Sequence, residues 1–169
     1  MTRWMFDIEK TDIGDTMARI MDHEDYMIMA LEEAHKARKK DEVPIGAVII
    51  DKNGNVVSKA HNQVIHLADP TAHAEMLCIR DASLKNSNYR LLNMSLYVTV
   101  EPCVMCMGAV VHSRIEKIFF GANDPKWGAA GSIYNFSNDG LLNHRPEVTG
   151  GILQEACSLI IQDFFRSKR

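Results

Sequence analysis

Residue types that bind zinc in proteins occur in two short segments of this chain. His73 stands two residues before Glu75, and Cys103 and Cys106 form a Cys-x-x-Cys pair that begins directly after Pro102. Imidazole nitrogen and thiolate sulfur are both good ligands for zinc, which is a borderline-soft cation. A helix that starts at the cysteine pair places residues i and i+3 on one face, and its positive dipole end stabilises both thiolates. The sequence therefore predicts a zinc site made of His73, Cys103 and Cys106.

The number of ligands favours a catalytic zinc over a structural one. Structural sites use four protein ligands, whereas catalytic sites keep one position for water. Cys78 lies five residues after His73, roughly 140° around an ideal helix, and is predicted to point into the core. Three protein ligands plus water is thus the better interpretation. For the Cys-x-x-Cys motif by itself, a redox pair and half of a structural zinc site remain alternatives.

Glu75 is the candidate proton acceptor beside the metal. Two thiolates formally cancel the charge of Zn²⁺, which makes the metal a milder Lewis acid and a nearby base more valuable. One geometric condition applies, because residues i and i+2 of an ideal helix point about 200° apart. His73 and Glu75 share a cavity only if the first turn of their helix projects into the site.

Alternating helices and strands are predicted to position these residues. Helices are predicted at 23–40, at 72–85 with Thr71 as N-cap, from Glu101-Pro102 onward, and at 153–165. Strands are predicted at 44–50, 55–60, 96–100, 117–121 and around Val148, with an Asn53-Gly54 hairpin turn between the first two. Helices that separate strands indicate a layered α/β domain.

Composition indicates one globular domain and leaves room for a nucleic-acid partner. The chain has 169 residues, of which 46% are hydrophobic and 24% charged, near the average for folded proteins. The net charge of -3 argues at first sight against binding to phosphates. Residues 1–33, however, contain nine acids and three bases, so the rest of the chain has an excess of three bases.

We expect a cytoplasmic protein with no membrane segment. No run of apolar residues approaches the ~18 needed to cross a bilayer, and the acidic N-terminus does not resemble a secretory signal. The four cysteines are too few and too unevenly spaced for a disulfide framework. Cys78 and Cys157 are predicted to be core thiols.

Two surface features have more than one interpretation. Lys36, Arg38, Lys39 and Lys40 crowd the last turn of the first predicted helix. Such a cluster is more typical of a solvated helix end, where cations favour the dipole, than of a phosphate contact. Trp127 lies in a polar loop and is equally well explained as a packing lid or as a platform on which a base stacks.

The motifs together resemble the bacterial tRNA-specific adenosine deaminases, in the zinc-dependent cytidine/deoxycytidylate deaminase superfamily. The superfamily resemblance rests on residues 69–75 and 96–106. The narrower one rests on shorter downstream segments, at 105–109, 112–115, 120–122, 128–132, 143–145 and 163–166. The resemblance implies a three-layer α/β/α sandwich around a five-stranded mixed sheet. It covers 23–169 as a zinc-dependent deaminase domain and leaves 1–22 as an unexplained N-terminal extension.

The resemblance also implies a reaction and a set of roles. Adenosine at the wobble position of a tRNA anticodon would become inosine by attack of zinc-bound hydroxide at C6, with release of ammonia. His73, Cys103 and Cys106 would bind one zinc ion per subunit, and Glu75 would carry the proton to N1. The enzyme would be a homodimer. Its substrate, a tRNA anticodon stem-loop, would contact five further residues, Asn62, Ala74, Asp124, Phe165 and Arg166.

Two other functions remain open at this point. The same zinc site would serve a deaminase of a free base or nucleotide, such as guanine, cytosine or deoxycytidylate. A non-catalytic, zinc-stabilised RNA-binding module is the alternative from another class. Trp127 departs from the small or polar residue that the resemblance predicts before Gly128, so RNA recognition by this loop is expected to differ.

Overall fold

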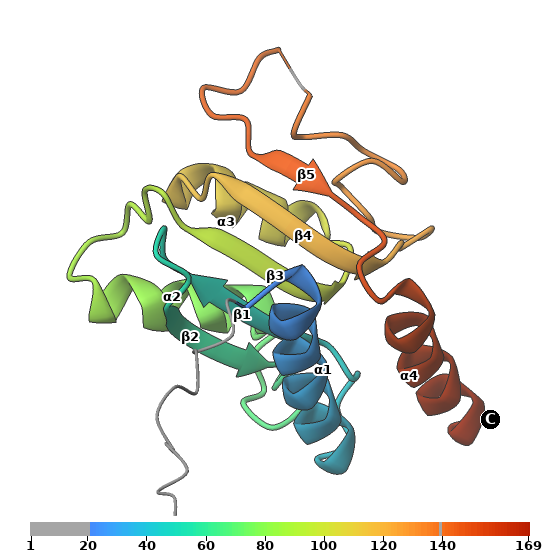
Figure 1. Ribbon diagram of the computed structural model, residues 1–169. Helices are drawn as coiled ribbons and strands as arrows, with labels where there is room; N and C mark the ends of the chain where they lie inside the picture. Colours follow the sequence, from blue (N-terminus) through green and yellow to red (C-terminus); the bar gives the residue numbers. More distant parts are fainter. Residues whose placement is uncertain (1–20, 139) are drawn as a thin grey trace, which may run out of the picture.

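The computed structural model describes residues 21–138 and 140–169, in which a five-stranded sheet lies between two pairs of helices (Figure 1). The helices are α1 (His23–Lys39), α2 (Ala74–Lys85), α3 (Val104–Ser113) and α4 (Gln154–Ser167). The strands are β1 (Gly46–Ile50), β2 (Val56–His61), β3 (Ser95–Val100), β4 (Lys117–Ala122) and β5 (Glu147–Thr149).

The sheet is mixed, with the strand order β2-β1-β3-β4-β5. β1 pairs antiparallel with both β2 and β3, whereas β3, β4 and β5 run parallel. The parallel strands are connected through α3 and through the long loop before β5, as crossovers require. The predicted five-stranded mixed sheet in a three-layer α/β/α sandwich is therefore confirmed.

Each face of the sheet has its own hydrophobic core, because side chains alternate along a strand. Ala47 and Ile49 of β1 pack with α2 and α3 on one face, while Val48 and Ile50 pack with α1 and α4 on the other. Both faces are covered, so β1, β3 and β4 are buried almost throughout. This burial explains why these strands are continuous apolar runs in the sequence.

Most of the predicted elements are confirmed within a few residues, and the hairpin turn is one of them. Gly54 has a φ of +83°, which a residue without Cβ adopts freely. Asp51 accepts the backbone N–H groups of Asn53 and Asn55 at 2.8 and 2.9 Å and so fixes the turn. At the start of α1, Asp22 and Asp25 form a capping box.

Two predicted helix starts were wrong by a small but informative amount. The N-cap of α2 is His73, not Thr71, because Asp69 Oδ1 binds both the N–H and the hydroxyl of Thr71 and closes a local turn. The N-cap of α3 is Cys103, so Pro102 precedes the helix instead of lying in its first turn. Most of the predicted N-terminal extension, 1–20, lies outside the described residues.

Among the helices of the described segments, none is both long enough and apolar enough to span a bilayer.

Candidate metal centre and active site

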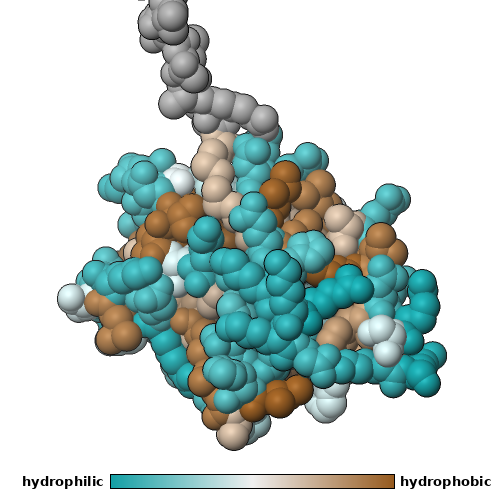
Figure 2. Space-filling model, turned by 90° about the horizontal axis from the view of Figure 1, so that it is seen from below, coloured by the Kyte–Doolittle hydropathy of each residue, from teal (hydrophilic) through white to brown (hydrophobic). Residues whose placement is uncertain are grey.

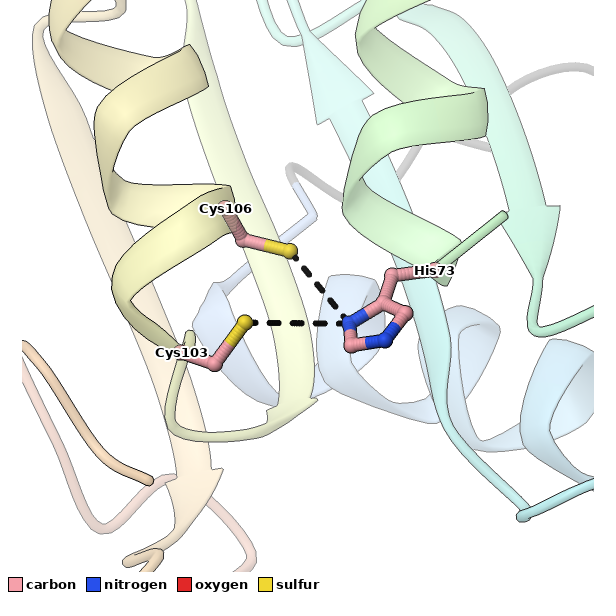
Figure 3. A group of neighbouring side chains, drawn as sticks. All are labelled: His73, Cys103 and Cys106. Carbon is pink, nitrogen blue, oxygen red and sulfur yellow. Dashed lines mark hydrogen bonds between the residues drawn. The ribbon is translucent and has the colours of Figure 1, made fainter. Parts of the chain in front are cut away.

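The starts of two helices bring His73, Cys103 and Cys106 together at one edge of the sheet. His73 Nδ1 lies 3.7 Å from Cys103 Sγ and 3.6 Å from Cys106 Sγ, and Figure 3 shows the imidazole facing both sulfurs across the gap between α2 and α3. One ligand atom from each residue falls within 4.8 Å of the others, close enough for all three to bind one metal ion. The three predicted metal ligands are thus neighbours in the fold.

The backbone at the start of α2 explains how His73 and Glu75 both face the site. His73 is extended, with φ -71° and ψ 153°, and therefore stands outside the helix that begins at Ala74. The angular rule for residues i and i+2 of a helix does not apply across this junction. Both side chains line the same pocket.

The geometry and chemistry of these donors fit zinc. With bond lengths of about 2.1 Å to nitrogen and 2.3 Å to sulfur, two ligand atoms of a tetrahedral zinc ion stand roughly 3.5 Å apart. The two nitrogen–sulfur distances of 3.6 and 3.7 Å agree with this separation. Cys78 is no fourth ligand, because it lies on the core side of α2 and its thiol faces the carbonyl oxygen of Ala47.

The thiols of the site differ electrostatically from those of the core. A hydrogen bond from Cys106 lowers the pKa of Cys103 to about 4, and the same bond raises the pKa of Cys106. Cys103 is therefore the more readily ionised of the two thiols, and binding of a divalent cation to both sulfurs displaces the remaining proton. In contrast, burial raises the pKa of Cys78 and of Cys157 to about 12, which keeps both as inert core thiols.

Glu75 carries an unpaired carboxylate oxygen inside the pocket. The residue is 3% exposed, and its Oε2 is the buried side-chain oxygen or nitrogen without a hydrogen-bond partner among the described residues. Burial raises the pKa of this carboxyl group. A buried carboxylate without a partner is costly to the fold, so this arrangement favours a group that exchanges protons with a bound molecule.

Asn62 and Ala74 form a buried hydrogen bond at the start of α2, next to His73. Asn62 Oδ1 accepts the backbone N–H of Ala74 at 2.8 Å, which satisfies the first free donor of the helix. Asn62 is 4% exposed and Ala74 is fully buried. A side chain just after β2 thereby fixes the residue that follows His73.

We predict that Asn62→Ala lowers the free energy of unfolding by about 1–2 kcal/mol, because the N–H of Ala74 loses its buried acceptor. Asn62→Asp keeps the accepting oxygen and is expected to retain most of the stability. Urea unfolding of both variants checks this difference. Equal stability losses in the two variants would mean that the oxygen at this position does not support α2.

The metal pocket continues into a second groove. The pocket has a volume of about 580 Å³ and includes Ile45, Asp124 and Trp127 as well as His73 and Glu75. The same three peripheral residues also line a neighbouring groove of about 530 Å³, which extends to Phe165 on α4. Trp127 is 67% exposed at the border between the two hollows, so it is accessible to a ligand and does not act as a buried packing residue.

The structure separates the other predicted substrate residues by position. Asp124 lines both hollows, and its Oδ1 accepts the backbone N–H groups of Lys126 and Trp127 at 2.9 and 3.2 Å. Phe165 is 48% exposed and lines the groove alone. Arg166 projects from α4 outside these hollows and pairs with Asp163 at 3.4 Å.

Sequence reasoning missed Glu101, which anchors the loop that carries Asp124 and Trp127. Its buried carboxylate accepts the N–H groups of Asp124, Ala130 and Ser132 at 3.1, 3.0 and 2.9 Å, and also the Ser132 hydroxyl. A Cβ at Gly128 would lie 2.5 Å from this carboxylate, so the loop passes very close to it. An acid directly before Pro-Cys was the available signal.

Comparisons with known proteins agree with this site. Residues 20–122 match the model of the cytidine and deoxycytidylate deaminase zinc-binding region. The tRNA-specific adenosine deaminase of Haemophilus influenzae is 48% identical over 146 residues, which are 86% of this chain and 84% of the relative.

Solved structures of deaminases share this fold. A structure from a study of A-to-I editing by tRNA:A34 deaminases at the wobble position is 41% identical, with a TM-score of 0.77 over 80% of this chain and 97% of that one. The guanine deaminase of Bacillus subtilis is 28% identical, with a TM-score of 0.59 over 87% and 95% of the two chains. The chain belongs to the cytidine and deoxycytidylate deaminase family, in which it is similar to the bacterial tRNA-specific adenosine deaminases.

Proposed function

We propose that this protein converts adenosine to inosine at the wobble position of a tRNA anticodon, by hydrolysis with release of ammonia. The observation that carries the proposal is a three-ligand metal pocket that also contains the unpaired carboxylate oxygen of Glu75. Relatives that align over most of their length and are named tRNA-specific adenosine deaminases support the choice of substrate.

The three metal ligands and Glu75 have separate tasks in this proposal. His73, Cys103 and Cys106 hold one zinc ion per subunit. Bound zinc supplies a Lewis acid that makes water nucleophilic near neutral pH. Glu75 accepts a proton from the attacking water at its free oxygen and delivers it to N1 of adenine, then assists the departure of ammonia.

The surroundings of the pocket suit an unpaired nucleotide with neighbours on both sides. Anticodon-loop bases are already unstacked, so little energy is needed to extrude the target base. Asn62 and Ala74 position the nucleoside in the pocket, and Asp124 contacts the adjacent sugar–phosphate. Phe165 contacts a flanking nucleotide in the groove and Arg166 contacts one beside it, while Trp127 offers a face for stacking at the entrance of the groove.

We also propose that the protein acts in the cytoplasm as a homodimer. Ile65 and Leu67 are 71% and 49% exposed in the loop after β2. Contact with a second copy would remove these two neighbouring apolar side chains from water. Sedimentation analysis at micromolar concentration tests the assembly.

The substrate is tested by incubating purified protein with an anticodon stem-loop and, separately, with free nucleosides and bases. We expect inosine in the stem-loop at the wobble position, read as guanosine on sequencing, and loss of this product after treatment with a chelator. Similarity to guanine deaminase makes guanine the most informative competitor. Rapid turnover of a free base together with an unchanged stem-loop would replace the tRNA proposal by the free-base alternative.

A further inference from the structure

Seven exposed cations gather where the C-terminal ends of α1 and α4 come together. Figure 1 shows both helices projecting beyond the same edge of the sheet, and the ion pair between Lys168 and Asp41 joins their ends. We call this group the basic surface; its members are Lys36, Arg38, Lys39, Lys40, Arg166, Lys168 and Arg169. Figure 2, which views the molecule from this end, shows hydrophilic residues across the centre of the face.

The basic surface adjoins the hollows of the active site. Val43 and Ile45 lie in the short segment between α1 and β1 and line the groove, and Ile45 also lines the metal pocket. Phe165 lines the groove from α4, one residue before Arg166. An RNA chain that leaves the metal pocket and follows this groove therefore reaches the basic surface.

Nearby acids neutralise part of this charge. Lys36 pairs with Glu33 at 2.6 Å, Arg166 with Asp163 at 3.4 Å, and Lys168 with Asp41. Glu42 does not add to this neutralisation, because its carboxylate is 1% exposed and accepts the backbone N–H groups of Ile65 and His66.

Arg38 and Lys39 keep their charge exposed. Within the described segments, neither side chain has a hydrogen bond or an ion pair. Favourable interaction with the dipole of α1 accounts for cations in its last turn. The dipole of α4 accounts in the same way for Arg166 in its last turn. Neither dipole accounts for the meeting of the two helix ends, which the Lys168–Asp41 pair joins and which places two sets of like charges on one face.

We propose that the basic surface binds the phosphate backbone of the base-paired stem next to the loop whose base enters the metal pocket. The proposal rests on the proposed function and adds a second region of contact with the same RNA. Lys and Arg that neutralise phosphates release condensed counterions, which favours binding independently of sequence. A-form stems are recognised in this way, by shape and backbone. Arg38 and Lys39, as the cations of α1 whose side chains have no partner among the described residues, are expected to make the main contacts.

The test is the double variant Arg38→Glu/Lys39→Glu, assayed on an anticodon stem-loop and on an unpaired oligonucleotide of the loop sequence. For the stem-loop we expect KM to rise about tenfold at unchanged kcat, and its salt dependence, log KM against log salt, to fall in slope by about 2. For the unpaired oligonucleotide, KM is expected to stay at the parental value. This difference between substrates identifies the stem as the partner.

Lys52→Glu/Arg90→Glu is the matched control, with the same charge change at the opposite end of the sheet. Lys52 lies in the hairpin after Ile50, which pairs with Ser95 at the start of β3, and Arg90 lies in the loop before β3. The control is expected to keep the parental KM on both substrates. Equal effects of the two double variants, or an equal rise of KM on both substrates, would overturn the proposal.

If the protein lacks the proposed deaminase activity, the experiment gives a result that is distinct from failure of the basic-surface proposal. In that case the unmodified protein deaminates neither RNA, and fluorescence anisotropy with the labelled stem-loop replaces KM as the readout. Weaker binding by Arg38→Glu/Lys39→Glu alone would still support the basic surface as an RNA contact. Unchanged binding would refute it independently.

Discussion

Glu75→Gln is expected to lower kcat by about 10²- to 10⁴-fold, the usual contribution of general acid–base catalysis. The amide has nearly the shape of the carboxyl group but cannot accept the proton that Glu75 takes up at its free oxygen. The variant is expected to keep its zinc, because Glu75 is not among the grouped metal ligands. Its stability should equal or exceed that of the parent, since a buried carboxylate whose pKa is raised by burial is replaced by a neutral group. Single-turnover kinetics, metal analysis and thermal unfolding measure the three properties.

Glu42→Gln is the matched control for this prediction. Glu42 is as buried as Glu75, but one of its oxygens accepts the N–H groups of Ile65 and His66 at 2.9 and 2.8 Å. The same chemical change there is expected to lower stability and to leave kcat within about tenfold of the parent, because this carboxylate is bound to the backbone. A Glu75→Gln enzyme with near-parental kcat would refute the role of Glu75 and favour the non-catalytic RNA-binding alternative.

The layered fold follows from patterns that are local in the sequence. Ala47, Val48, Ile49 and Ile50 form an uninterrupted apolar run, which is typical of a strand covered on both faces, and the structure buries all four. The Asn53-Gly54 pair marks the hairpin because a positive φ is needed there. Helix starts were less certain, since competing local hydrogen bonds, such as those of Thr71 with Asp69, decide the first helical residue.

The residue types of the site could be predicted from the sequence, but the residues that hold them in place could not. Zinc preferences identify His73, Cys103 and Cys106 from the sequence, and the structure brings them together. The geometric condition on Glu75 required coordinates, because only the extended backbone of His73 removes the helical angle between the two residues.

The long-range supports of the site have no periodic signal. Asn62 reaches Ala74 twelve residues later, and Glu101 reaches Ser132 thirty-one residues later. Each contact depends on how strands and loops meet at one edge of the sheet. Such contacts follow from tertiary packing, so a single sequence identifies the chemistry of this pocket more readily than the residues that hold it in place.

Cys106→Ala is expected to abolish zinc binding and to lower stability to that of the chelator-treated parent. Cys106 is fully buried in the first turn of α3, where it contributes one of two sulfurs to the metal group. Metal binding stabilises the folded state by mass action, since the preformed group of ligands exists only when the chain is folded. We therefore expect the parent to contain about one zinc per subunit and to lose thermal stability with chelator, whereas the variant contains none and does not respond.

Cys157→Ala distinguishes loss of the metal from loss of a buried thiol. Cys157 is also fully buried, but on α4 in the core of the other sheet face. This variant is expected to lose about 1 kcal/mol through a small cavity, while it keeps its zinc and its response to chelator. Zinc retention by Cys106→Ala, or a parent whose thermal stability is indifferent to chelator, would contradict a metal centre at this pair of helix starts. The comparison is decisive because the two thiols are equally buried, but Cys106 has a histidine and a second thiol beside it whereas Cys157 is not part of that group.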